Sequence, residues 1–86
     1  MRVIDLPVEP NNNKTELSID TFNGCYEFHT TLKYGFLTTI LHDIFENKSN
    51  FFITLIDKQG EPYFTQFFNF NNIVTACERE YEVNND

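Results

Sequence analysis

The sequence predicts a small single-domain α+β protein, in which one amphipathic helix packs on an antiparallel sheet in the order β-β-α-β-β-β. Three observations lead to this fold class. An Asn23-Gly24 dipeptide separates two alternating segments, apolar residues recur at helical spacing over 37–45, and a dense apolar run at 51–56 precedes a turn with Gly and Pro. At 86 residues, 41% of them hydrophobic, the chain can form one core.

The first two strands are expected near 15–22 and 25–31. Apolar side chains alternate before and after the Asn-Gly dipeptide, at Leu17, Ile19, Tyr26 and Phe28. Asn-Gly between two alternating segments is a strong hairpin signal. Residues 1–14, with two prolines and an Asn triplet, are expected to form a flexible arm that could add a short edge strand. Residues 15–83 would form the domain and residues 84–86 a tail.

The helix is predicted from one apolar stripe at positions i, i+3, i+4, i+7 and i+8, formed by Leu37, Ile40, Leu41, Ile44 and Phe45. It would end at Asn47-Lys48. Its start is expected near Leu32, with Thr30 or Thr31 as the N-cap, or else after Gly35, because glycine inside a helix costs about 1 kcal/mol.

The remaining strands are expected at 51–56, as a central strand, and at 63–70, joined by the turn 57–62 into a second hairpin. The last segment, 73–83, fits a strand or a helix capped by Asn71 or Asn72. Its β-branched start at 73–75 favours the strand. Residues 63–70 contain five aromatic residues, Tyr63, Phe64, Phe67, Phe68 and Phe70. Because strand side chains alternate between two faces, all five can be buried only if both faces of the sheet are covered. A face that is left uncovered would be an interface.

Composition excludes several classes of function. The formal net charge of −7 argues against direct nucleic-acid binding through phosphates. The amino-terminal segment lacks the apolar run of a secretory signal. No segment approaches the roughly 18 apolar residues of a membrane span. We therefore expect a cytoplasmic location and no membrane partner. Cys25 and Cys77 are expected to be buried thiols, with a disulfide only if their strands are neighbours.

No chemistry emerges from the nucleophiles, histidines or glycines. Cys25 and His29 would project from one strand face roughly 13 Å apart, beyond hydrogen-bond reach. His42 fits a solvated helix face, and the three glycines stand too far apart for a phosphate loop. We therefore expect no enzyme, no cofactor and no metal site.

The acidic end of the chain is the main candidate surface. From Glu61 onward five acids face one Arg, a charge of −4, while residues 1–60 carry eight acids and five bases, or −3. As a strand, residues 78, 80 and 82 would place carboxylates about 6.6 to 6.8 Å apart, twice the axial spacing of phosphates along one DNA strand. The candidate partner-binding residues are Glu61, Glu78, Glu80, Glu82 and Asp86. The alternative is a solvated edge that resists aggregation.

A short acidic chain, rich in Asn and Phe and without a catalytic signature, resembles in composition the small proteins with which phages and mobile elements block host restriction and CRISPR nucleases. That resemblance implies a non-enzymatic inhibitor or modulator of a larger, basic, nucleic-acid-handling protein. The alternative is a structural or assembly subunit, a homodimer for example, that self-associates through an aromatic sheet face or an edge strand.

Overall fold

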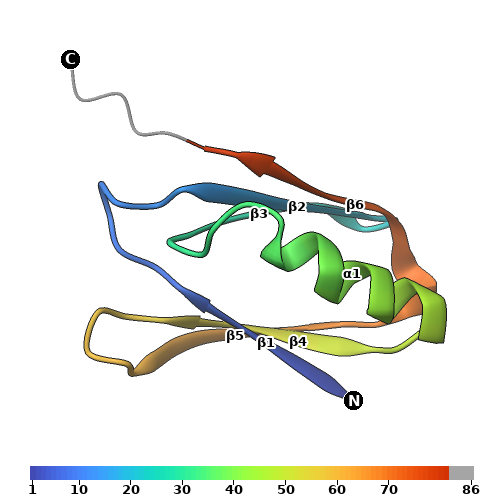
Figure 1. Ribbon diagram of the computed structural model, residues 1–86. Coiled ribbons are helices and arrows are strands. Elements are labelled where there is room, and N and C mark those ends of the chain that lie inside the picture. The colour runs from blue at the N-terminus through green and yellow to red at the C-terminus, as the bar shows by residue number, and fades with distance from the viewer. Residues whose placement is uncertain (82–86) are drawn as a thin grey trace.

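Two three-stranded sheets form the two layers of the protein, and one helix lies along their side (Figure 1). The computed structural model describes residues 1–81. The α+β class predicted from the sequence is confirmed. The elements in chain order are β1 (Arg2–Pro7), β2 (Thr15–Thr21), β3 (Gly24–Thr30), α1 (Phe36–Asn47), β4 (Phe51–Ile56), β5 (Pro62–Phe68), the 3-10 turn η1 (Phe70–Asn72) and β6 (Ile73–Glu80).

The strands divide between sheet A, in the order β1-β4-β5, and sheet B, in the order β3-β2-β6. All neighbouring strands are antiparallel except β1 and β4, which are parallel. One feature therefore differs from the expected order, because the strands form two sheets instead of one. Residues 1–14 contribute the edge strand β1, the alternative that the sequence left open for this arm, and Ile4 and Leu6 of β1 are buried. Burial of two branched side chains stabilises the ordering of that segment.

Both predicted hairpins are confirmed, since β2 pairs with β3 and β4 with β5. β4 is the central strand of sheet A, as expected. The apolar run was also expected to be covered on both faces, but Phe52 and Thr54 on its outer face are partly exposed. The segment after η1 is a strand and not a helix, and it pairs with β2 over Ile73–Glu80. The strand was predicted to run from 73 to 83, and β6 ends at Glu80. Positions 82 and 83 of the predicted strand lie outside the described residues.

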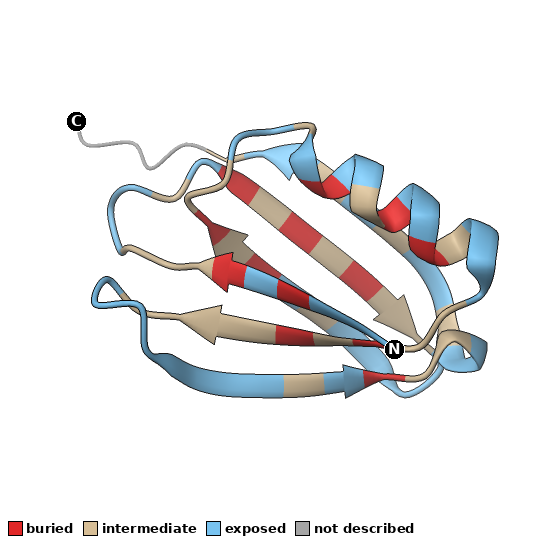
Figure 2. Ribbon diagram, turned by 60° about the horizontal axis from the view of Figure 1, so that its bottom comes forward, coloured by how far each residue is buried: buried red, intermediate tan, exposed pale blue. Residues whose placement is uncertain are grey.

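The core lies between the two sheets and receives the apolar stripe of α1 (Figure 2). Its buried members are Ile4, Leu6, Leu17, Ile19, Phe28, Leu37, Leu41, Ile44, Phe51, Ile53 and Phe68. Two buried threonines form a cross-strand pair among them, and each satisfies its hydroxyl on a backbone carbonyl. Thr15 donates to Leu32 at 2.6 Å and Thr30 donates to Pro7 at 2.7 Å.

The helix begins after Gly35, the second of the two predicted starts, so neither Thr30 nor Thr31 is its cap. Gly35 is the N-cap residue, with φ of 104°, in the left-handed region that glycine tolerates best. Glycine has no side chain to accept a hydrogen bond from the first turn, and the first turn carries no acidic residue. The helix amides must therefore find their acceptor elsewhere in the fold.

Among residues 1–81, no helix has both the length and the apolar character that a membrane crossing requires.

Candidate functional site

The face of β6 that the sequence predicted to be an acidic row turns toward the helix. Ala76 on this face packs against the core, and Glu78 is only partly exposed. The two residues share this face with Glu80 because successive strand side chains alternate. The alternation of side chains along β6 was therefore predicted correctly. The face expected to be an exposed acidic row instead lies against the start of α1.

The Glu78 carboxylate supplies the acceptor that the N-terminus of α1 lacks. One oxygen accepts from the backbone N–H of Thr38 at 2.9 Å and from its hydroxyl at 2.6 Å. The other accepts from the N–H groups of Gly35 at 2.9 Å and Leu37 at 3.4 Å. A carboxylate at this position satisfies unpaired amides and also interacts favourably with the helix dipole. Glu78 thus has a role within the fold.

The other predicted partner-binding residues are spread over the molecule. Glu80 is exposed at the end of β6 and lines a hollow of about 590 Å³ with Lys14 and Lys33. Glu61 is exposed in the turn between β4 and β5, on the other sheet. Glu82 and Asp86 lie outside the described residues. Within residues 1–81, the predicted row is not one continuous surface.

The outer face of sheet A carries an apolar patch formed by Val3, Phe52, Tyr63 and Phe67, called here the sheet A patch. Val3, Phe52 and Phe67 are direct cross-strand neighbours. The rings of Phe52 and Phe67 lie 5.2 Å apart. Val3 and Tyr63 are each 57% exposed and Phe67 is 43% exposed. Large apolar groups gathered on one face are typical of an interaction surface.

Within the described residues, strand β5 combines this patch with an unpaired edge. It is the outermost strand of sheet A, and Figure 2 shows it exposed along most of its length. Residues 62–77 contain no Asp, Glu, Lys or Arg. Edge strands are commonly protected by charges, so a neutral aromatic edge is available for strand pairing. This charge-free run can be read from the sequence, but the net charge of the chain does not reveal it.

The outer face of sheet B is polar, in contrast to sheet A. Alternation along each strand directs one set of polar side chains outward from all three strands. These are Glu16, Ser18 and Asp20 of the central strand β2, Cys25, Glu27 and His29 of β3, and Thr75, Cys77 and Arg79 of β6. The expectation of buried cysteines is wrong, because both thiols are exposed and free. A disulfide between them does not form, because β2 separates their strands.

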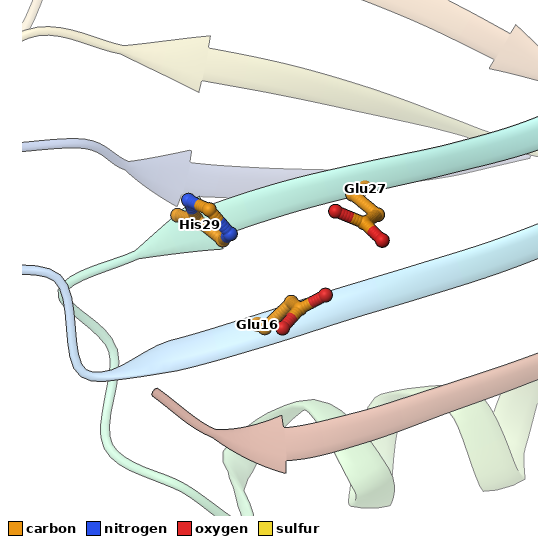
Figure 3. Close-up of side chains that lie close together, drawn as sticks. All are labelled: Glu16, Glu27 and His29. Atoms are coloured by element: carbon orange, nitrogen blue, oxygen red, sulfur yellow. The ribbon is translucent and has the colours of Figure 1, made fainter. Parts of the chain in front are cut away.

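Three side chains on this face converge between β2 and β3 (Figure 3). Glu16 lies directly opposite His29, and Glu27 precedes His29 by two residues on the same strand. Their nearest ligand atoms all lie within 4.8 Å of one another. The imidazole of His29 stacks on the ring of Tyr81, with centroids 4.1 Å apart and an interplanar angle of 16°. Sequence spacing could not reveal this cluster, because it depends on the register of the hairpin.

Asp20 influences the neighbouring thiol on the same face. A hydrogen bond from the Cys25 thiol to the Asp20 carboxylate, together with its negative charge, raises the pKa of Cys25. The same hydrogen bond and one from Thr75 lower the pKa of Asp20. Only the thiolate is a strong nucleophile, so this environment makes Cys25 less reactive. His42, for its part, is exposed on α1 beside Glu46, with 3.5 Å between Nδ1 and Oε2.

No protein-family model, no curated protein and no solved structure matches this chain.

The role of Glu78 can be tested by removing its charge. We expect Glu78→Gln to lower the free energy of unfolding by roughly 1–2 kcal/mol, because helix amides lose a charged acceptor. Urea unfolding followed by circular dichroism measures the change. Glu80→Gln is the matched control, two residues along the same strand face and exposed, and should change stability little. Equal losses in the two variants would contradict the assignment.

The influence of Asp20 on Cys25 can be tested by alkylation. Asp20→Asn should make Cys25 react faster with iodoacetamide at pH 8, because a lower pKa leaves more thiolate at that pH. Mass spectrometry of the peptide that contains Cys25 measures the rate, and Cys77 serves as an internal reference. Asp43→Asn on the helix should leave the rate unchanged. An unchanged rate in Asp20→Asn would show that the carboxylate does not control the thiol.

Proposed function

We propose that the protein is a non-enzymatic protein-binding domain that self-associates through strand β5 and the sheet A patch. The observation that carries this proposal is the uncharged, aromatic, unpaired edge of sheet A. The occupant that it fits is a second copy of the chain. Two copies with a net charge of −7 each repel one another, and an uncharged strand is where that repulsion opposes contact least.

An antiparallel pairing of two β5 strands about a twofold axis at Thr65 gives the contact a definite register. Tyr63 of one copy then lies opposite Phe67 of the other, and the same pair occurs twice. Aromatic cross-strand pairs contribute about 0.2 to 1 kcal/mol each. The paired region, 63–67, excludes Pro62, which has no N–H to donate. The two copies of sheet A would form one six-stranded sheet, with aromatic side chains on either side of a central pair of Thr65 residues on its outer face.

Charge placed at the twofold axis tests this arrangement. Thr65→Glu would set two carboxylates opposite each other only in the dimer, so we expect a monomer by light scattering where the wild type is a dimer. Thr65→Lys should also be monomeric, and an equimolar mixture of the two variants should dimerise again. Thr39→Glu, an exposed threonine on α1, should remain dimeric.

A wild-type protein that stays monomeric at high concentration would overturn the proposal, as would a Thr65→Glu variant that remains a dimer.

The outer face of sheet B favours a second candidate function, an inhibitor or modulator of a larger basic, nucleic-acid-handling protein. Three carboxylates, Glu16, Asp20 and Glu27, share this face with one guanidinium, that of Arg79. Exposed Glu61 and Glu80 add acidic charge at other positions. Such charge accelerates association with a basic partner more than it increases final affinity.

A matched pair of charge reversals tests this second candidate. Glu16→Lys with Glu27→Lys should abolish low-salt capture of a basic, nucleic-acid-handling protein from the source or host cell. Asp5→Lys with Glu46→Lys makes the same change of charge at two exposed positions away from sheet B and should retain that protein. High salt should weaken wild-type capture. Equal recovery by the two variants, or capture that is insensitive to salt, would exclude this binding mode.

A further inference from the structure

The cluster of Glu16, Glu27 and His29 has the geometry of a metal-binding site. Two ligands stand at i and i+2 of β3, and the third is the cross-strand neighbour on β2, so all three project from one face. Figure 3 shows the two carboxylates and the imidazole directed toward the same space between the strands. The rigid hairpin holds the three positions, and the side chains need only rotate to close on an ion.

The distances fit an ion better than direct contact. Among residues 1–81, no ion pair within 4.0 Å and no hydrogen bond joins these three side chains to one another, although their ligand atoms lie within 4.8 Å. Metal–ligand bonds of about 2.0 to 2.2 Å in a tetrahedral site place ligand atoms about 3.3 to 3.6 Å apart. A shift of about 1 Å, within the reach of partly exposed side chains, would therefore close the site.

Arg79 on β6 is the cross-strand neighbour of Glu16. The guanidinium of Arg79 hydrogen-bonds to the sulfur of Cys77 at 3.7 Å. This hydrogen bond to Cys77 and, after it, the negative charges of Glu16 and Glu27 raise the pKa of Arg79. Within the described chain neither carboxylate forms an ion pair with it. The carboxylates of Glu16 and Glu27 repel each other at this separation, and a divalent ion between them would remove that repulsion.

Tyr81 provides an independent contribution, because its stacking on His29 holds the plane of the imidazole. A ring that is already oriented loses less conformational freedom when it binds an ion. Imidazole as a ligand favours zinc, copper or nickel, whereas calcium and magnesium prefer sites made of oxygen atoms.

We propose that Glu16, Glu27 and His29 bind a divalent transition-metal ion, with Zn²⁺ as the reference ion and water in the remaining coordination position. The site is independent of self-association through sheet A, because it lies on the other sheet. It also departs from the sequence-based expectation of no metal site, which considered ligand spacing along the chain and not across strands.

Calorimetric titration of the protein with zinc chloride tests the proposal. We expect one ion per chain, with affinity reduced at least tenfold in Glu16→Gln, Glu27→Gln and His29→Gln, since losing even a supporting group costs 10- to 100-fold. His42→Gln and Glu46→Gln are matched controls, because they contain the same residue types in a pair that lacks a third ligand, and their affinity should be unchanged. Arg79→Gln should bind more tightly because a competing cation is lost.

Further measurements separate this site from the alternatives. The imidazole NMR signals of His29 should shift on zinc addition while those of His42 stay in place, and calcium chloride should not compete. Cys25→Ser with Cys77→Ser should retain binding, since the thiols are not ligands in this proposal. Loss of binding in that double variant, unchanged affinity in Glu16→Gln and His29→Gln, or no saturable binding by the wild type would each overturn the assignment. Unchanged circular dichroism shows that each variant is folded.

Discussion

The four hydrogen bonds from the start of α1 to the carboxylate of Glu78 unite the two parts of the fold. A twelve-residue helix is marginal on its own, and α1 begins at a glycine with no capping side chain. The carboxylate of Glu78 caps the first turn of the helix and attaches that turn to sheet B. Leu37, Leu41 and Ile44 can then fill the side of the core, and Arg2 at the start of β1 meets Asp43 of the helix at 2.7 Å. The single helix thereby links both sheets.

Within residues 1–81, two three-stranded sheets and one short helix leave both outer faces without cover, and the two faces carry different side chains. Sheet B directs carboxylates, thiols and an imidazole outward, as an antiparallel sheet with one solvated face does. Sheet A directs Phe52 and Phe67 outward from β4 and β5, next to the hydrogen-bonded pair of Thr54 and Thr65. An apolar outer face on a small acidic protein is the less usual arrangement and supports the proposed self-association, whereas the polar face is compatible with water and with ions. Association and ion binding are therefore assigned to opposite sides of the molecule.

Local sequence patterns predict the individual strands and the helix. The contacts between segments that are distant in the chain have no local pattern, and these contacts could not be predicted. Asn23-Gly24, the stripe from Leu37 to Phe45 and the alternation after Ile73 each act over a few residues, so both hairpins, the helix body and β6 were accessible from the sequence. The parallel pairing of β1 with β4 spans some fifty residues and has no local signature. For the same reason Glu78 looked like a free surface acid, since its partners at 35–38 are distant in the chain. The cluster on sheet B requires knowing that residue 16 faces residue 29, which only the register supplies.

The distribution of charge along the C-terminal third reconciles an acidic chain with self-association. Glu61 precedes the charge-free run and Glu78 follows it, so the acids flank β5 and do not lie within it. In a pairing centred on Thr65, Glu61 lies beyond the paired residues and opposite Asn69 of the second copy, where no like charge faces it. A pairing centred on Tyr63 would bring Glu61 opposite Thr65 and place Pro62 inside the ladder, where its missing N–H leaves an acceptor unpaired. The charge and the proline at the start of β5 therefore act together to favour one register, which is the one that pairs the aromatic rings.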